Sequence, residues 1–170
     1  MIARMRGKAW VFPQLLEIDF HLLPFETVRM LRDRGIPRTE AELGKYALTG
    51  VDPDFPKKVR RGDFIVGGES MGYGHDHNDA CKAIKGAGVA AILCESTNAY
   101  FMRNCIDHGL PIIEYRGITR LVKQGDELEI DLEAGTVKDL TGGSNLDFTP
   151  FPQFILQILA DGGLYPHLVR

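Results

Sequence analysis

Polar and titratable side chains are concentrated in one short, glycine-containing segment of the chain. Five consecutive residues there could bind a ligand or move a proton: His75, Asp76, His77, Asn78 and Asp79. They follow Gly72 and Gly74, which let the backbone approach a ligand closely. Histidine donates hydrogen bonds or exchanges a proton near neutral pH. We therefore expect residues 72–79, called the glycine loop below, to hold the functional site.

Dinucleotide binding is one interpretation of a glycine loop between a strand and a helix. The glycines here are Gly67, Gly68, Gly72 and Gly74, a spacing that does not match G-x-G-x-x-G. An acidic residue at the start of the helix, Asp79, would also repel a pyrophosphate. The sequence therefore disfavours this class of site.

Metal binding is a second interpretation, because His75 and His77 form a His-x-His pair. Asp76 and Asp79 could add oxygen ligands. A third ligand at a known distance cannot be read from the chain. The sequence accordingly assigns no metal site to this chain.

Carboxylate binding is a third interpretation. A loop that enters a helix offers free backbone N–H groups and the positive end of the helix dipole. The alternative is that Asp76 or Asn78 merely caps the helix and that both histidines are solvated. The local residues alone leave these two interpretations open.

The loop lies within a segment that alternates strand and helix patterns. Residues 63–113 read as strand, glycine loop, helix, strand, helix and strand. Residues 89–94 form a continuous apolar run, as expected for a strand buried on both faces. This order favours right-handed parallel crossovers, so we predict an α/β fold with a parallel βαβαβ core.

The flanking segments give weaker patterns. We predict a strand over 7–12, a second strand over 15–23 with one polar face, and a helix over 25–34. A capping-box pattern starts a short helix at Thr39, and two prolines make 51–58 an irregular connector. Residues 118–140 read as β-rich and antiparallel, 141–145 as a loop, and 150–163 as a C-terminal helix.

Composition limits the possible partners. The chain has 170 residues, 44% of them hydrophobic, and a formal net charge of -3, so we expect one domain, 1–170, without a nucleic-acid or membrane partner. No apolar run spans a bilayer, and no signal peptide is recognised. Three cysteines without a C-x-x-C pair indicate reduced thiols in the cytoplasm, and no cluster or structural zinc held by this chain. Cys81, Cys94 and Cys105 are expected to be structural.

Several segments resemble those of a known family, in the same order along the chain. They are 42–46, 52–58, 59–74 with its Gly67-Gly68-Glu69-Ser70 run, Asn104-Cys105, 109–112 and 151–164. The resemblance is to the small subunits of 3-isopropylmalate dehydratase, the free-standing swivel domains of the aconitase superfamily. It implies an aconitase-type swivel domain with a mixed sheet, in which 25–58 faces the partner or substrate.

The resemblance also implies a division of labour between two chains. A separate large subunit would carry a [4Fe–4S] cluster, whose open iron acts as the Lewis acid. The small subunit would bind a carboxylate of a small acid substrate and supply the base. The implied activity is that of a hydro-lyase acting on a malate-type hydroxy-acid in leucine biosynthesis.

The chain departs from the family at its loop, where the family reads Gly-Cys-Gly-Ser-Ser-Arg-Glu-His. His75 stands at the expected serine base, Asp76 at the second serine and His77 at the arginine. Losing arginine removes a bidentate carboxylate clamp that one histidine replaces only in part. The family's Asp-Thr-Asp aligns with residues 18–20, so its second aspartate is lost or displaced to Asp19.

Two functional hypotheses follow. In the first, the chain is an active small subunit with a divergent substrate. Its base is His75, its carboxylate contact is His77, and Asp76 or Asp79 orients an imidazole. The other substrate-binding residues are then Gly72, Gly74, Asn78 and Asp19. In the second, the chain is a degenerate swivel domain that binds a partner or ligand without catalysis.

Overall fold

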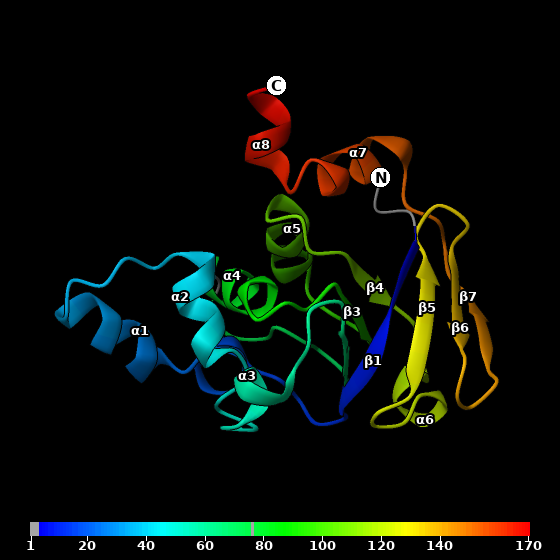
Figure 1. Ribbon diagram of the computed structural model, residues 1–170, viewed down its shortest axis with the longest axis horizontal. Helices are drawn as coiled ribbons and strands as arrows, with labels where there is room; N and C mark the ends of the chain where they lie inside the picture. Colours follow the sequence, from blue (N-terminus) through cyan, green and yellow to red (C-terminus); the bar gives the residue numbers. More distant parts are fainter. Residues whose placement is uncertain (1–3, 76) are drawn as a thin grey trace.

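The computed structural model of the chain describes residues 4–75 and 77–170. Within them, seven strands form one mixed sheet in the order β4-β3-β2-β1-β5-β6-β7, curled into a half-barrel (Figure 1). The strands are β1 (Arg4–Phe12), β2 (Phe64–Gly67), β3 (Ala91–Cys94), β4 (Ile112–Glu114), β5 (Glu127–Asp131), β6 (Thr136–Asp139) and β7 (Asn145–Asp147). The expected mixed α/β fold is confirmed.

Helices cover the sheet and its connections. They are η1 (a π-helix, Ile18–Leu22), α1 (Phe25–Asp33), α2 (Glu40–Leu43), η2 (a 3-10 helix, Gly44–Tyr46), α3 (Phe55–Lys58), α4 (Asp79–Gly86), α5 (Ala99–Asp107), α6 (Ile118–Leu121), α7 (Gln153–Ala160) and α8 (Leu164–Leu168). Helix α2 packs on α4, and α5 packs on α7 and α8 (Figure 1). None of these helices is long and apolar enough to cross a membrane, within the described residues.

The parallel half of the sheet has the order expected for residues 63–113. Strand β1 pairs in parallel with β2, β2 with β3, and β3 with β4. The connections of β2 to β3 and of β3 to β4 are α4 and α5, which gives the βαβαβ unit. Strands β2 and β3 are fully buried, as the continuous apolar run of 89–94 predicted for β3.

The antiparallel half begins on the other side of β1. Residues Arg4–Lys8 of β1 pair with β5, and β6 and β7 follow as antiparallel neighbours. Strand β1 therefore joins the two halves of the sheet. The predicted antiparallel β-rich segment over 118–140 is confirmed for β5 and β6.

The core lies on both faces of the sheet because side chains alternate along each strand. Ile65 and Ile92 pack into the cluster that includes α4 and η1, whereas Phe64, Val66 and Leu93 pack into the cluster on the opposite face. Burial on two faces holds the end of β2 rigidly. The glycine loop starts from that end.

Helices α2 and α5 both begin at a side-chain cap, and that of α2 was predicted from the sequence. The hydroxyl of Thr39 accepts a hydrogen bond from the N–H of Glu42 at 3.2 Å, which caps α2 as the capping-box pattern predicted. The side chain of Asn98 caps α5 in the same way through the N–H of Phe101 at 2.8 Å.

The predicted strand over 15–23 is wrong. Residues Ile18–Leu22 form the π-helix η1, with backbone hydrogen bonds from Leu22 N–H to Glu17 O at 3.0 Å and from Leu23 N–H to Ile18 O at 2.9 Å. The alternation of polar residues imitated a strand, but Phe20 is exposed and Ile18 and Leu22 are buried. In a strand Ile18, Phe20 and Leu22 would share one face, whereas in a helical turn Phe20 points away from the other two.

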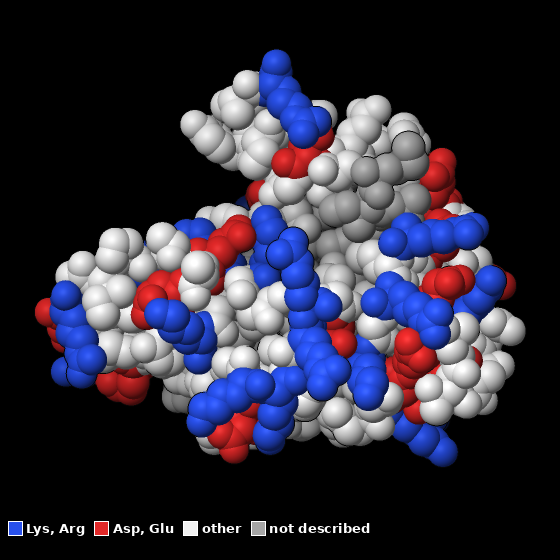
Figure 2. Space-filling model, in the orientation of Figure 1, with Lys and Arg blue, Asp and Glu red and all other residues white. Residues whose placement is uncertain are grey.

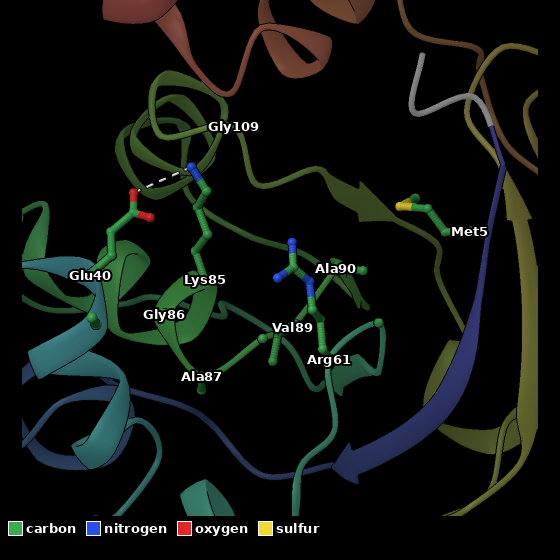
Figure 3. A pocket seen from close by; sticks show the side chains of 12 residues that line it. Met5, Glu40, Arg61, Lys85, Gly86, Ala87, Val89, Ala90 and Gly109 are labelled. Carbon is green, nitrogen blue, oxygen red and sulfur yellow. Dashed lines mark ion pairs between the residues drawn. The ribbon is translucent and has the colours of Figure 1, made fainter.

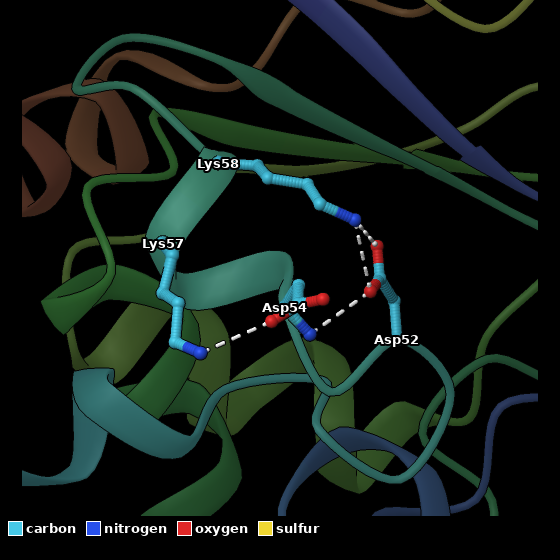
Figure 4. Close-up of polar contacts among 4 residues, drawn as sticks. All are labelled: Asp52, Asp54, Lys57 and Lys58. Atoms are coloured by element: carbon cyan, nitrogen blue, oxygen red, sulfur yellow. Dashed lines mark hydrogen bonds and ion pairs between the residues drawn. The ribbon is translucent and has the colours of Figure 1, made fainter.

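The predicted irregular connector over 51–58 contains helix α3. Asp52 accepts a hydrogen bond from the N–H of Asp54 at 3.0 Å, and Lys57 and Lys58 lie near these carboxylates at 3.1 and 3.4 Å (Figure 4). The prolines that suggested an irregular segment stand at or before the first turn, where the missing N–H is tolerated.

Within the predicted β-rich region, residues Ile118–Leu121 form helix α6. Its first N–H groups, from Gly117 and Thr119, are bound by the carboxylate of Glu95, which is remote in sequence. Partial burial opposes the charge of Glu95, but these hydrogen bonds outweigh it and hold the pKa of the carboxyl below its usual range. Strand β7 and helix α8 were not predicted.

Candidate functional site

The glycine loop lies at the carboxyl end of β2, between this strand and α4. In open α/β sheets the carboxyl ends of the parallel strands form the crevice in which ligands bind. Two backbone hydrogen bonds tie the loop to the start of η1 and to the segment before it. They join Gly72 N–H to Leu16 O at 2.9 Å and Ile18 N–H to Tyr73 O at 2.8 Å.

Both glycines of the loop are required by close contacts. Gly72 has a φ of +75° and lies so near the ring of Phe101 that a Cβ would overlap it. Gly74 has a φ of +111°, and a Cβ there would lie 2.8 Å from Cγ of Glu17. These left-handed conformations let the loop turn back over η1.

Helix η1 brings Asp19 to the loop. Ile18 and Leu22 anchor the helix in the core, and the N–H of Glu17 donates to Nδ1 of His21 at 2.9 Å. Asp19 lies on the side of the helix that faces the loop. π-Helical turns occur frequently at functional sites, where they reposition a side chain.

Asp19, His75 and His77 converge at this point. Oδ1 of Asp19 lies 2.7 Å from Nε2 of His77, and Oδ2 lies 3.9 Å from Nδ1 of His75. The side chains of Asp19 and His77 are 18% and 23% exposed, whereas that of His75 is 80% exposed. One carboxylate therefore holds a sheltered imidazole, while the second imidazole stays accessible to a ligand.

His77 is more constrained than the sequence predicted. Its Nε2 faces Asp19, and its Nδ1 is buried without a hydrogen-bond partner among the residues that the structure describes. Neither nitrogen points into solvent in this conformation. His77 is thus placed to position the loop, and it contacts a substrate carboxylate only after its ring turns.

The remaining residues of the loop are placed differently. The Asp79 carboxylate is buried and contacts Arg38 at 2.5 Å and Lys82 at 3.8 Å. It is therefore Asp19, rather than Asp79, that the structure places beside an imidazole. Asn78 is exposed and precedes α4 without a capping hydrogen bond from its side chain. Asp76 lies outside the described residues.

Arg38 was missed by sequence reasoning. It brings a guanidinium to the first turn of α4 from 41 positions earlier in the chain. No local motif surrounds Arg38, and only the packing of the α1–α2 connection next to α4 reveals the contact.

The three cysteines lie in the core. Cys81 and Cys105 join α4 to α5 with Sγ atoms 3.4 Å apart, and Sγ of Cys94 donates to the carbonyl of Ile113 at 3.8 Å. Burial raises the pKa of Cys94 to about 12 and that of Cys105 well above its usual value. These thiols do not converge at the surface, so they do not fit the ligand set of an iron–sulfur cluster.

We expect thiol alkylation of the native chain to be slow. The thiolate is the reactive species, and at pH 8 a thiol with the pKa of Cys94 is deprotonated in only about one molecule in 10⁴. Iodoacetamide labelling followed by mass spectrometry should show three modified cysteines in denaturant and almost none in buffer. Rapid, stoichiometric labelling of one native cysteine with loss of function would contradict this expectation.

A hollow of about 700 Å³ lies at the other end of the parallel strands, next to Arg61 and Val89 (Figure 3). Lys85 forms an ion pair there with Glu40 at 3.3 Å. Lys and Arg side chains form a band across this face of the molecule (Figure 2). Its lining residues Arg61 and Val89 come shortly before β2 and β3 in the chain. The hollow therefore lies at the end of these strands opposite to the glycine loop.

Comparison with known proteins gives a consistent result. The isopropylmalate/citramalate isomerase small subunit of Methanocaldococcus jannaschii is 41% identical over 166 residues, which cover 98% of this chain and 94% of that protein. The 3-isopropylmalate dehydratase small subunit 1 of Thermotoga maritima is 40% identical over 166 residues, with 98% and 95% covered. No family model matches the chain.

Solved structures agree. The crystal structure of 3-isopropylmalate dehydratase from Methanocaldococcus jannaschii superposes with a TM-score of 0.86 and 31% identity, over 98% of this chain and 93% of that one. A protein of the UPF0107 group shares the fold alone, with a TM-score of 0.52 and 17% identity. The extent of the match and its level of identity lead to one conclusion: the chain belongs to the family of 3-isopropylmalate dehydratase small subunits.

Proposed function

We propose that the chain completes a two-subunit hydro-lyase in leucine biosynthesis. Its substrate is 3-isopropylmalate or another substituted malate, such as the citramalate named for the Methanocaldococcus jannaschii relative. The observation that supports this proposal is the convergence of Asp19, His75 and His77 at the loop after β2. Reduced, buried thiols accord with a cytoplasmic enzyme.

His75 is the proposed base. Its imidazole is the exposed member of the cluster, so it can reach the carbon-bound proton of a substrate placed between the two subunits. His77, fixed by Asp19, positions the loop that carries His75. Dehydration removes a proton from one carbon of the substrate and the hydroxyl from the neighbouring carbon. In this proposal, the chain provides the group that accepts the proton.

The substrate carboxylate is bound at the start of α4 in this proposal. Gly72 and Gly74 let the backbone come close, Asn78 is exposed beside it, and the helix N-terminus favours an anion. Asp76 and Asp79 complete the set proposed from the sequence, and Asp79 acts by holding Arg38 near the same turn. In the large subunit, a [4Fe–4S] cluster would supply the Lewis acid for the departing hydroxyl.

We expect the isolated chain to fold but to dehydrate no hydroxy-acid. Its three thiols are unsuited to hold a cluster, so the Lewis acid must come from the partner. The measurement compares dehydration of 3-isopropylmalate and citramalate by the chain alone, the cognate large subunit alone, and the mixture. Activity should require both chains.

Turnover by the isolated chain would contradict the division of labour. Stable association with the large subunit but no turnover with any substituted malate would instead favour the non-catalytic swivel domain. The ratio of the kcat/KM values for the two substrates identifies the preferred substrate.

A further inference from the structure

The fold supplies the third metal ligand that the His-x-His pair lacks in sequence. One donor atom each from Asp19, His75 and His77 can be chosen so that all three lie within 4.8 Å of one another. The carboxylate comes from η1, which is 58 positions from His77 in the chain. The His-x-His pair, an ambiguous signal in sequence, thus becomes part of a cluster of three ligands of recognised types.

The separations between the donor atoms of this cluster lie on either side of the separation expected between two ligands of a bound transition metal. Two ligands that each lie about 2.1 Å from a tetrahedral Zn²⁺ are about 3.4 Å apart. The carboxylate oxygens of Asp19 lie 2.7 Å from Nε2 of His77 and 3.9 Å from Nδ1 of His75. Small side-chain rotations equalise these separations, and the exposed His75 is free to make them.

The charge balance also suits a cation. Both ion-pair partners of Asp19 in the described part of the chain are histidines, so no lysine or arginine neutralises this carboxylate. Two neutral imidazoles and one carboxylate carry a net charge of -1. Such mixed nitrogen and oxygen ligands suit Zn²⁺ and its neighbours rather than Mg²⁺, which prefers oxygen alone.

We propose that Asp19, His75 and His77 form a binding site for a divalent transition-metal cation of the Zn²⁺ class. Three protein ligands leave the fourth position open on the solvent side, next to the exposed His75. The site uses the same imidazoles as the proposed function, so cation binding and proton transfer at His75 exclude each other. Direct measurement of binding therefore tests this proposal separately from catalysis.

A second His–Asp pair in the chain provides a matched control. Nδ1 of His167 on α8 lies 2.8 Å from Oδ2 of Asp161, almost the same spacing as in the His77–Asp19 pair. The second ion-pair partner of Asp161 is Arg170 rather than another histidine. The variant His167→Ala should therefore leave cation binding unchanged.

The experiment is calorimetric titration of the purified chain with Zn²⁺, repeated with Mg²⁺. Binding at a 1:1 ratio is expected for Zn²⁺ and not for Mg²⁺. Each of Asp19→Asn, His75→Ala and His77→Ala should weaken Zn²⁺ binding by about 100-fold or more, since loss of even outer-shell partners costs 10–100-fold. The visible spectrum of the Co²⁺ form should show the intense bands of a four-coordinate site in the wild type and lose them in each variant.

The proposal is overturned if the wild type binds no Zn²⁺, if Mg²⁺ binds equally well, or if the three variants bind like His167→Ala. Circular dichroism checks that each variant is folded. His75 is the decisive position because its side chain is 80% exposed and its removal leaves the core unchanged. A Zn²⁺-free chain that is fully active with its large subunit would leave the proposed function intact.

Discussion

Replacing His75 with alanine lowers kcat of the assembled two-subunit enzyme by about 10²–10⁴-fold, the loss expected when a general base is removed. The imidazole is largely exposed and Asp19 lies 3.9 Å away, so the substitution removes a proton acceptor without disturbing the core. KM should change much less, because the backbone of the glycine loop and the first turn of α4 remain. Steady-state kinetics with saturating large subunit measures both constants.

Two further variants make this result interpretable. His167→Ala removes a histidine that also pairs with an aspartate but lies on α8, and it should leave kcat unchanged. His77→Ala removes the partner of Asp19 and should mainly raise KM, because the loop loses its anchor. If His75→Ala and His77→Ala both leave kcat and KM near wild type, the loop is structural and the non-catalytic swivel domain is the better hypothesis.

Gly72→Ala lowers the free energy of unfolding by about 2–5 kcal/mol. The left-handed conformation costs a residue with a Cβ about 1–2 kcal/mol, and overpacking of a filled core costs a further 1–3 kcal/mol. Here the new Cβ would overlap the ring of Phe101, which is fully buried on α5. Urea unfolding of the chain, with the slope of the transition compared between variants, measures the loss.

Gly143→Ala separates the two contributions. Its φ of +82° is close to the +75° of Gly72, but a Cβ there meets nothing within 4 Å. This variant should therefore show only the conformational cost of about 1–2 kcal/mol. In a Phe101→Ala background, Gly72→Ala should likewise approach this smaller value. Equal losses for the two glycine variants in the wild-type background would show that the ring of Phe101 is not the constraint.

Much of the fold could be predicted because its signals are local. The continuous apolar run of 89–94 marks β3 as a strand buried on both faces, and the capping residue Thr39 marks the start of α2. The crossover order of 63–113 follows from strand and helix patterns that alternate. These features depend on neighbours in sequence, so they can be read without the rest of the chain.

The secondary-structure predictions that proved wrong lie where contacts between distant residues override a local sequence pattern. The segment 15–23 alternates like a strand, but its residues Ile18–Leu22 fold as η1. Ile18 and Leu22 pack into the core, and the N–H of Ile18 donates to Tyr73 O in the glycine loop. Residues Ile118–Leu121 become α6 because Glu95 binds the first N–H groups of the helix from a neighbouring strand end.

At the site, the loop could be found from local residues, because two glycines, two histidines and a helix N-terminus lie within eight positions of one another after an apolar strand. Which carboxylate meets the imidazoles depends instead on how distant segments pack. Asp79 is the near neighbour in sequence, yet it turns away into its ion pair with Arg38, while Asp19 arrives on η1. The physical reason is that a buried carboxylate needs a cationic partner, and packing rather than sequence distance brings one to it.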